Sequence, residues 1–254
     1  TAGQNSLLVL GGTDNGWTQD AFGRSGLKWG QGGITAALAI RKPQALNGAL
    51  GAVMVDGTKT SAPVLTPNTA TFADGSLLFV DGRGLNGAAA LTAQGGTLNV
   101  DADAKLLMEH ITQGEYTITS GFSVNNVQGW SGDNLYTPDN LLGLVLGKAD
   151  DGSMKVRATA RRSSDVFRGL SLVNTMDAIW GKGLNDTESG NMGLRFLSRA
   201  VNNALSKADT VRTVDGAALL AVAGGVRGMA LAAADAPIRA VQDHASLAHM
   251  TATR

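Results

Sequence analysis

The segment "SLLFVDGRGLNGAAALTAQGGTLNV" (residues 76–100) contains two short apolar runs joined by a glycine-rich stretch. Three of its glycines match the G-x-G-x-x-G spacing of a dinucleotide-binding turn: Gly82, Gly84 and Gly87. Asp101 even lies near the distance expected for a ribose-binding acid. A dinucleotide site, however, needs a helix after the third glycine, and only residues 88–94 precede a Gly-Gly pair and the next apolar run. We therefore interpret the motif as a turn between strands and expect no cofactor.

Short runs of the same kind extend on both sides of this segment, up to about residue 183. They cover residues 6–10, 34–40, 76–80, 97–100, 105–109, 116–120, 141–147 and 154–160. The last run, "MKVRATA", alternates apolar and polar residues, which is the period of a half-buried strand. Turn-forming Gly, Asn and Asp residues separate the runs, including Asp81-Gly82, Gly95-Gly96 and Asp151-Gly152. The pattern predicts a mainly β body.

A sandwich, a barrel and a solenoid are all compatible with such strands. The chain of 254 residues contains 34 glycines and only 5% aromatic residues, and this composition suits a thin stacked core. The segments "NSLLVLGG" (5–12) and "GSLLFVDG" (75–82) also echo each other as a faint internal repeat. These features favour a right-handed parallel β-helix with coils of roughly 20 to 25 residues, about eight of them before residue 183.

The pattern becomes helical near residue 185. Apolar residues recur three and four positions apart at Leu194, Leu197, Val201 and Ala204. A second helical stretch covers residues 213–236, and Pro237 ends or kinks it. The predicted organisation is β-helix coils at 1–120, a cap at 121–184 and a helical segment at 185–254.

Residues 217–234 carry a single charge, Arg227, so a membrane span has to be considered. An arginine at the centre of a span costs about 2.5–3.5 kcal/mol, and the segment is rich in Ala and Gly rather than Leu. Small residues recur every three or four positions at Ala217, Ala221, Gly224, Gly225, Gly228 and Ala232. They predict a thin helix suited to close packing or to a narrow channel; ordinary packing of an Ala-rich helix is the alternative.

Composition excludes several classes of function. The 21 basic and 21 acidic residues balance, so no overall charge attracts nucleic acid. The absence of cysteine excludes disulfides, thiolate metal sites and cysteine catalysis. A basic cluster is interpreted as the solvated face of a strand: Lys155, Arg157, Arg161, Arg162 and Arg168.

No convincing catalytic constellation is present, and we expect no enzyme activity. The histidines, His110, His244 and His249, match no metal or nucleophile motif. Asp101 and Asp103 are spaced to share one face of a strand, as in β-helical polysaccharide-cleaving enzymes. A β-helical lyase or hydrolase acting on glycans is therefore an alternative hypothesis.

Taken in order, these segments resemble a bacterial autotransporter (type V secretion) near the junction of passenger and translocator. Residues 75–123 resemble the last β-helix coils of such passengers. Residues 130–161, "WSGDNLYTPDNLLGLVLGKADDGSMKVRATAR", resemble the cap region often called the autochaperone. Residues 173–203 and 213–247 resemble the helical connector.

The resemblance implies a monomeric passenger, exported through the periplasm and displayed at the outer membrane and bacterial cell surface, as in adhesins and other virulence factors. Its implied partners are the family's own C-terminal β-barrel, which this sequence lacks, the outer-membrane assembly machinery, and host-cell or glycan ligands, with no nucleic acid. Trp130 and Trp180 are then expected to fix the cap, and the thin helix to lie in the pore. The paired asparagines at which some members cleave themselves are missing. A phage or surface fibre module, which would trimerise, is a further alternative.

Overall fold

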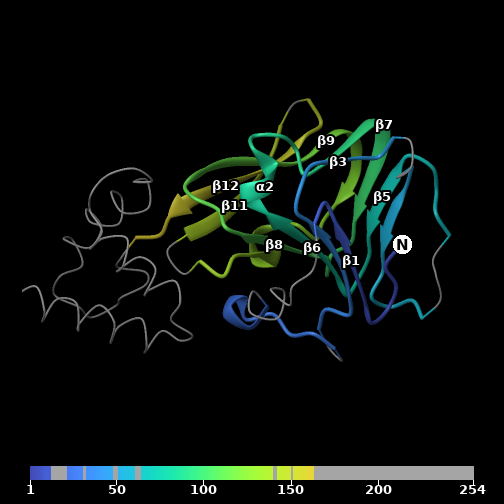
Figure 1. The fold of residues 1–254 in the computed structure, drawn as a ribbon, viewed down its shortest axis with the longest axis horizontal. Coiled ribbons are helices and arrows are strands. Elements are labelled where there is room, and N and C mark those ends of the chain that lie inside the picture. Colours follow the sequence, from blue (N-terminus) through green and yellow to red (C-terminus); the bar gives the residue numbers. More distant parts are fainter. Residues whose placement is uncertain are drawn as a thin grey trace, which may run out of the picture. The chain divides into compact units, whose positions relative to one another are not determined.

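The computed structural model describes residues 1–12, 22–30, 33–47, 51–60, 64–139, 142–149 and 151–162. The chain divides into two units, Thr1–Leu205 and Ser206–Arg254, and every described residue belongs to the first. The predicted helical segment 185–254, with its row of small residues from Ala217 to Ala232, lies outside the described residues, as does Trp180. The described part is mainly β with parallel sheets, as predicted (Figure 1).

The first sheet contains only parallel pairs. Its strands, in spatial order, are β1 (Ser6–Leu10), β2 (Ala36–Ile40), β6 (Ser76–Asp81), β8 (Lys105–Glu109) and β10 (Leu135–Tyr136). The strands pair in register, so equivalent residues form rows across the sheet, such as Leu8, Leu38, Leu78, Leu106 and Leu135. In such a row, side chains of the same kind from neighbouring strands stack on one another in the core.

The echo between residues 5–12 and 75–82 has a structural meaning. Ser6 of β1 and Ser76 of β6 both pair with Ala36 of β2, one from each side. Asn5 and Gly75, which precede these strands, both have left-handed backbone, with φ of 62° and 71°. Asparagine and glycine are the residues that adopt this conformation most readily. The repeated sequence therefore marks the same turn and the same register in two strands.

The second sheet has parallel and antiparallel parts. Its strands, in spatial order, are β4 (Val53–Val55), β5 (Thr69–Phe72), β7 (Leu91–Val100), β9 (Gly114–Val127), β12 (Met154–Ala160) and β11 (Leu142–Lys148), and β3 (Gln44–Ala45) pairs with β7. Pairs from β4 to β9 are parallel, whereas β12 is antiparallel to both β9 and β11. From β5 to β11 consecutive strands belong alternately to the two sheets. From β5 to β10, each new strand lies next to the strand that came two before it in the chain.

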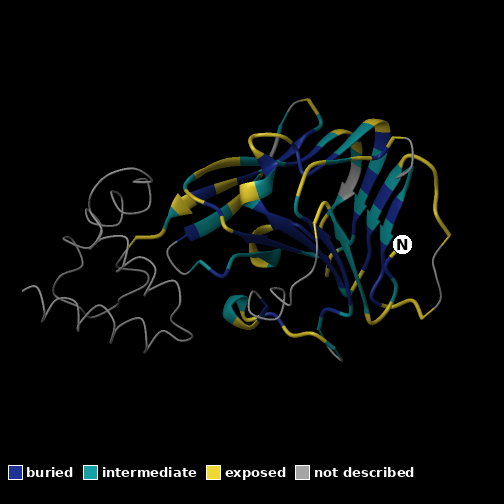
Figure 2. Cartoon of the chain, in the orientation of Figure 1, coloured by how far each residue is buried: buried dark blue, intermediate teal, exposed yellow. Residues whose placement is uncertain are grey.

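Apolar side chains fill the space between the sheets and also cover the outer face of the first sheet. The strands of both sheets carry many of the buried residues (Figure 2). The outer cover comes from a segment that includes a helical turn at residues 22–25, with Phe22, Leu27 and Ile34 packed on Phe79 and its neighbours. Both faces of β2 and β6 are therefore buried. This explains why their sequences are continuous apolar runs rather than alternating ones.

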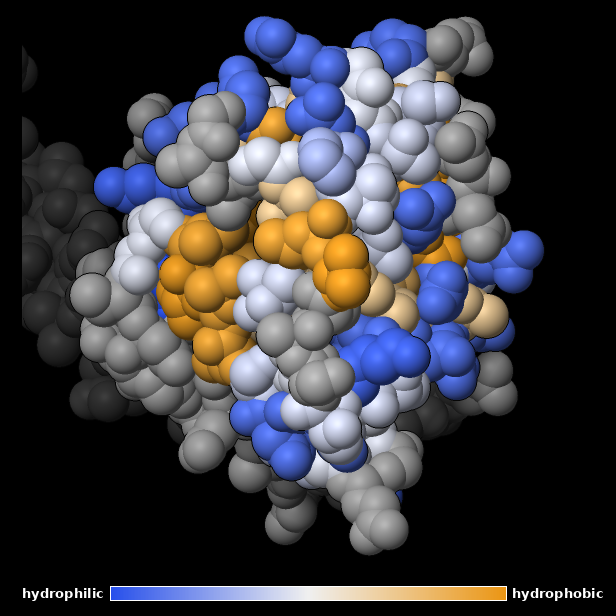
Figure 3. All heavy atoms as spheres, turned by 90° about the vertical axis from the view of Figure 1, so that its right-hand side faces the viewer, coloured by the Kyte–Doolittle hydropathy of each residue, from blue (hydrophilic) through white to orange (hydrophobic). Residues whose placement is uncertain are grey.

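Hydrophobic residues also gather on the end of the unit seen in Figure 3, which is the right-hand side of Figure 1. Among the described strands, β1 and β4 are the edge strands at the N-terminal side of the two sheets. Every residue of β1 is half-buried, including Leu7, Leu8, Val9 and Leu10. This edge combines apolar side chains with backbone groups that no described strand pairs.

The glycine-rich stretch is a single helical turn, α2 (Gly82–Leu85), capped by the Asp81 side chain, which accepts a hydrogen bond from the Arg83 amide. A Cβ on Gly84 would overlap the Arg41 carbonyl oxygen, so this glycine permits close backbone packing. The turn ends at Asn86, which has left-handed backbone. The interpretation of the motif as a turn between strands is confirmed.

The predicted turn at Gly95-Gly96 is wrong. Both glycines lie inside β7, where the register with β9 shifts between Thr92 and Gly96. The first part of β7 pairs with β3 and its last part with β5, so the strand continues through an irregularity. Gly95, with φ of 71°, supplies the left-handed backbone that such a bulge requires.

Candidate functional site: the cap hairpin and an ionic cluster

The strands β11 and β12 form a hairpin, here called the cap hairpin, that pairs antiparallel with β9. Its turn is closed by hydrogen bonds between Ala149 and Ser153 and from Gly152 to Ala149. The Asp151 carboxylate accepts a further bond from the Ser153 amide at 2.9 Å, and hydrogen bonds from Ser153 lower the pKa of Asp151. The turn predicted at Asp151-Gly152 is thus confirmed.

The cap hairpin buries one face and exposes the other. Met154, Val156 and Ala158 of β12 lie in the core, while Lys155 and Arg157 point outward. Lys155 Nζ lies 3.0 Å from Glu115 Oε1 on β9, and Arg157 Nη2 lies 4.0 Å from Glu115 Oε2. The alternation predicted from "MKVRATA" is confirmed, and the described basic residues form an outward face; Arg168 is outside the described residues.

Trp130 lies between β9 and β10 and is fully buried in the core between the sheets. Its ring centroid is 5.0 Å from that of Phe72, with an interplanar angle of 53°. No described residue hydrogen-bonds its indole nitrogen, which is also buried. Trp130 therefore stabilises the interior by packing, next to the last parallel strands.

Asp101 and Asp103 do not share the face of a strand, which corrects the geometry on which the glycan-cleaving alternative rested. They belong to the turn between β7 and β8, where Asp103 is exposed. Burial, followed by the charges of Asp74 and Asp56, raises the pKa of Asp101. Among the described residues no cluster of His, Asp and Glu has the arrangement of a metal site.

The densest group of charges lies at the carboxyl ends of β6 and β8, and we call it the ionic cluster: Arg24, Asp81, Arg83, Glu109 and His110. Asp81 and Glu109 are register partners at the ends of these strands. Asp81 and Glu109 lie two residues after Phe79 and Leu107, and side chains two residues apart on a strand point to the same face. The two carboxylates therefore lie on the outer face of the first sheet, beside the covering segment. Parallel pairing has therefore placed two nearly buried carboxylates next to each other.

Two arginines and an imidazole contact this carboxylate pair; each arginine contacts one carboxylate, and the imidazole lies near both. Arg24 Nη2 donates to Glu109 Oε1 at 2.8 Å. Arg83 donates from Nε and Nη2 to the two oxygens of Asp81 at 3.3 and 3.0 Å. His110 Nδ1 lies 3.4 Å from Asp81 Oδ1 and 3.7 Å from Glu109 Oε2. The backbone of His110 is left-handed, with φ of 53°, and turns the chain directly after β8.

The two carboxyl groups differ in acidity. Burial disfavours the charge of Asp81, but hydrogen bonds from His110 and Arg83 outweigh it and hold the pKa of Asp81 well below its ordinary value. Burial dominates at Glu109 and raises its pKa, although His110 and Arg24 act against the rise. The environments thus push the two pKa values apart.

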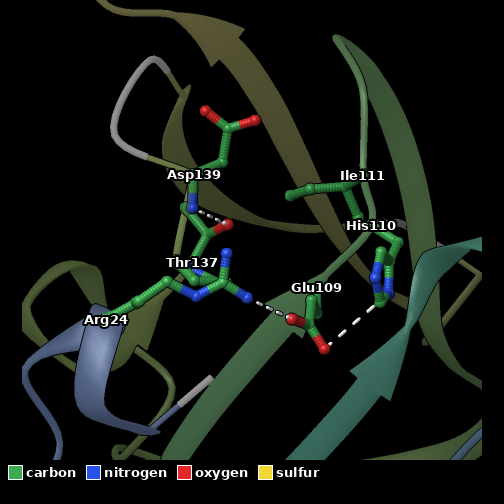
Figure 4. Close-up of a pocket in the computed structure, with 7 residues that line it drawn as sticks. Arg24, Glu109, His110, Ile111, Thr137 and Asp139 are labelled. Atoms are coloured by element: carbon green, nitrogen blue, oxygen red, sulfur yellow. Dashed lines mark hydrogen bonds and ion pairs between the residues drawn. The ribbon is translucent and has the colours of Figure 1, made fainter. Parts of the chain in front are cut away.

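A pocket opens beside the ionic cluster (Figure 4). Its lining residues come from the covering segment, the end of β8 and the chain after β10: Arg24, Glu109, His110, Ile111, Thr137, Pro138 and Asp139. Arg24 and Glu109 are 85 positions apart in the chain. Of these residues, the sequence analysis considered only His110, as a histidine without a metal or nucleophile motif, because no local motif connects it with Arg24.

Compared with protein-family models, curated proteins and solved structures, the chain has no significant match. Within the described ranges, the chain forms no helix of the length and apolarity that crossing a membrane requires. This statement does not cover the segment 217–234, which is not among the described residues.

Proposed function

We propose that the chain is the C-terminal part of an autotransporter (type V secretion) passenger, and that its two sheets are walls of a right-handed parallel β-helix. The observation that carries the proposal is the change of pairing along the chain. From β5 to β10 consecutive strands alternate between two sheets of parallel strands, and the cap hairpin then pairs antiparallel with β9. This is the arrangement expected of stacked coils followed by a terminal cap.

In this proposal the cap hairpin sets the direction of folding. It occupies the edge of β9, so among the described strands of the second sheet the outermost parallel strand is β4, at the other end. Each coil contacts mainly its neighbours and leaves an open edge on which the next can form. The half-buried apolar strand β1 is such an edge. The capped coils, with Trp130 buried beneath them, would form first and template those that precede them in sequence.

The biological role in this proposal is secretion-coupled folding and display of a surface protein such as an adhesin. Its partners are the translocator part of the same polypeptide, the outer-membrane assembly machinery, and host-cell or glycan ligands. The absence of cysteine supports export, because no disulfide can lock the chain before it crosses a membrane. The role requires no cofactor.

Refolding of two truncated chains tests the proposal. Deletion of residues 142–162 removes the cap hairpin but leaves β9 intact, whereas deletion of residues 1–10 removes the edge strand at the other end. We expect the first deletion to slow refolding strongly and to leave the parallel strands sensitive to protease. The second should change the refolding rate little. Equal effects of the two deletions would contradict a directional role of the cap.

Protease treatment of intact cells that produce the natural polypeptide tests display. A surface passenger is digested while cytoplasmic marker proteins remain whole. Digestion only after cell lysis would exclude surface display, whatever the outcome of the refolding experiment.

A further inference from the structure

We propose that the pocket between the helical turn 22–25 and residues 137–139 binds one ring of a neutral saccharide. The pocket lies apart from the cap hairpin, and none of its lining residues belongs to β9, β11 or β12. The proposal therefore stands or falls independently of secretion-coupled folding.

The size of the pocket limits the ligand. Its volume is about 200 Å³, smaller than the roughly 300–1,000 Å³ of pockets that enclose drug-sized ligands. The walls come from three segments that the fold holds together, and Figure 4 shows their side chains around a common space. A single sugar ring fits this scale, whereas a nucleotide or a folded peptide segment does not.

Glu109 supplies the clearest reason to expect a ligand. Its side chain is 7% exposed, and its Oε1 accepts the hydrogen bond from Arg24. Its Oε2 receives no hydrogen bond from any described residue, because His110 Nδ1 lies 3.7 Å away, beyond hydrogen-bond range. This oxygen is not among the buried polar atoms that lack a partner, so it is accessible from the pocket. A hydroxyl group in the pocket would donate to it.

The charges of the pocket favour a neutral ligand. Arg24 and Glu109 already neutralise each other, and Asp139 contributes a second carboxylate to the lining. An anion would approach two carboxylates and a cation would approach Arg24, and either would compete with the existing ion pair. Hydroxyl groups both donate and accept without bringing a charge. The Thr137 hydroxyl, the His110 imidazole and the Glu109 carboxylate are suitable partners for several hydroxyls of one ring.

The lining also contains apolar surface. Ile111 and Pro138 line the pocket together with these polar groups, and their aliphatic carbons can pack against the C–H face of a pyranose. A pocket with a few fixed polar groups and an apolar wall is typical of small-molecule sites. Because the pocket is only half enclosed and small, we expect affinity in the millimolar range.

Titration of the full chain followed by amide NMR tests the proposal. The neutral probes are the methyl glycosides of glucose, galactose and mannose, and the charged probes are galacturonate and glucosamine. We expect at least one neutral glycoside to shift the amide signals of His110, Ile111 and Thr137 in a saturable manner, and to bind more tightly than both charged probes. Absence of saturable shifts with all three glycosides, or tighter binding of a charged probe, would overturn it.

Two variants locate the site. Glu109→Gln keeps the shape of the side chain but replaces the carboxylate, and the buried position already favours an uncharged group. Thr137→Val removes only a hydroxyl. We expect each to weaken binding at least fivefold, with an otherwise unchanged amide spectrum. Glu115→Gln, the same change made on β9 of the second sheet and outside the pocket lining, is the control and should bind as the unmodified chain does. If both pocket variants bind normally, the site assignment is wrong.

Discussion

The parallel strands and the cap hairpin place charged residues in opposite ways. In-register parallel pairing puts Asp81 of β6 directly beside Glu109 of β8, so two like charges become neighbours. Antiparallel pairing puts Arg157 of β12 beside Glu115 of β9, so opposite charges face each other. In the parallel part, the compensating charges must therefore come from outside the strands, and Arg24 and Arg83 supply them from the helical turn 22–25 and from α2.

The same difference applies to apolar residues. Rows of leucine across the first sheet, such as Leu38, Leu78 and Leu106, are fully buried because neighbours cover both sides of each. The outermost strand of the cap, β11, has no described strand beyond it, and its Val145 is 61% exposed. Repeated apolar residues are thus buried in the parallel sheet, whereas the outermost strand of the cap hairpin exposes an apolar side chain to solvent.

The largest effect is expected where the two regions meet. Trp130→Ala removes a fully buried ring that packs on Phe72, and should lower the free energy of unfolding by about 3–5 kcal/mol. Trp29→Ala is the matched control, since Trp29 is 44% exposed. Denaturant unfolding measures both. A cost at Trp130 no larger than at Trp29 would mean that the ring does not support the junction.

Leucine truncation compares the interior of the parallel sheet with the edge of the cap. Leu78→Ala leaves a cavity between Leu38 and Leu106, and should cost about 2–5 kcal/mol. Leu146→Ala on β11 removes a half-buried side chain, so its cost should be clearly smaller. Equal costs in denaturant unfolding would show that the cap is as tightly packed as the stacked strands.

Substitution of two glycines with left-handed backbone, one in β7 and one in β9, tests how closely these parallel strands approach each other. Gly95 and Gly121 both have left-handed backbone, with φ of 71° and 76°. A Cβ on Gly121 would overlap the Ala93 carbonyl oxygen, whereas one on Gly95 meets nothing. Alanine at either position should cost about 1–3 kcal/mol for the backbone, and Gly121→Ala should cost more because β7 has to move. A ranking in the other direction would indicate that the strands separate easily.

The sequence predicted β1, β2, β6 and β8 of the first sheet, and both faces of β2 and β6 are buried and largely apolar. It did not predict β3, β4, β5 or β10, which have only two to four residues, too few to show a period. It predicted a turn at Gly95-Gly96, but β7 continues through these glycines as one bent strand. β3 pairs with the part of β7 before them, and β5 pairs with the part after them. The ionic cluster could not be predicted, because Arg24 meets Glu109 only after the covering segment folds onto β8.

Acidification should reveal the like-charged pair of the parallel part. The pKa of Asp81 is held low, so its contribution to stability is complete above its ordinary value of 3.8 and is lost as pH falls below that. The pKa of Glu109 is raised, so the stability that its protonation provides appears as pH falls through a value above 4.5. Denaturant unfolding from pH 7 to pH 3 should show Asp81→Asn removing the acid-side loss, and Glu109→Gln removing the gain above pH 4.5. Unchanged profiles in both variants would mean that the cluster is not coupled to folding.

The smallest effect is expected from the opposite-charge pair of the cap. Lys155 and Glu115 are both substantially exposed, so the coupling between them in a double-mutant cycle with alanine should be about 0.2–1 kcal/mol and should shrink in 1 M salt. Coupling between Arg24 and Glu109 should be larger and less sensitive to salt, because Glu109 is nearly buried. The comparison of the two regions requires this ranking. A stronger coupling in the exposed Lys155–Glu115 pair than in the Arg24–Glu109 pair would contradict the expectation that burial strengthens the ionic cluster.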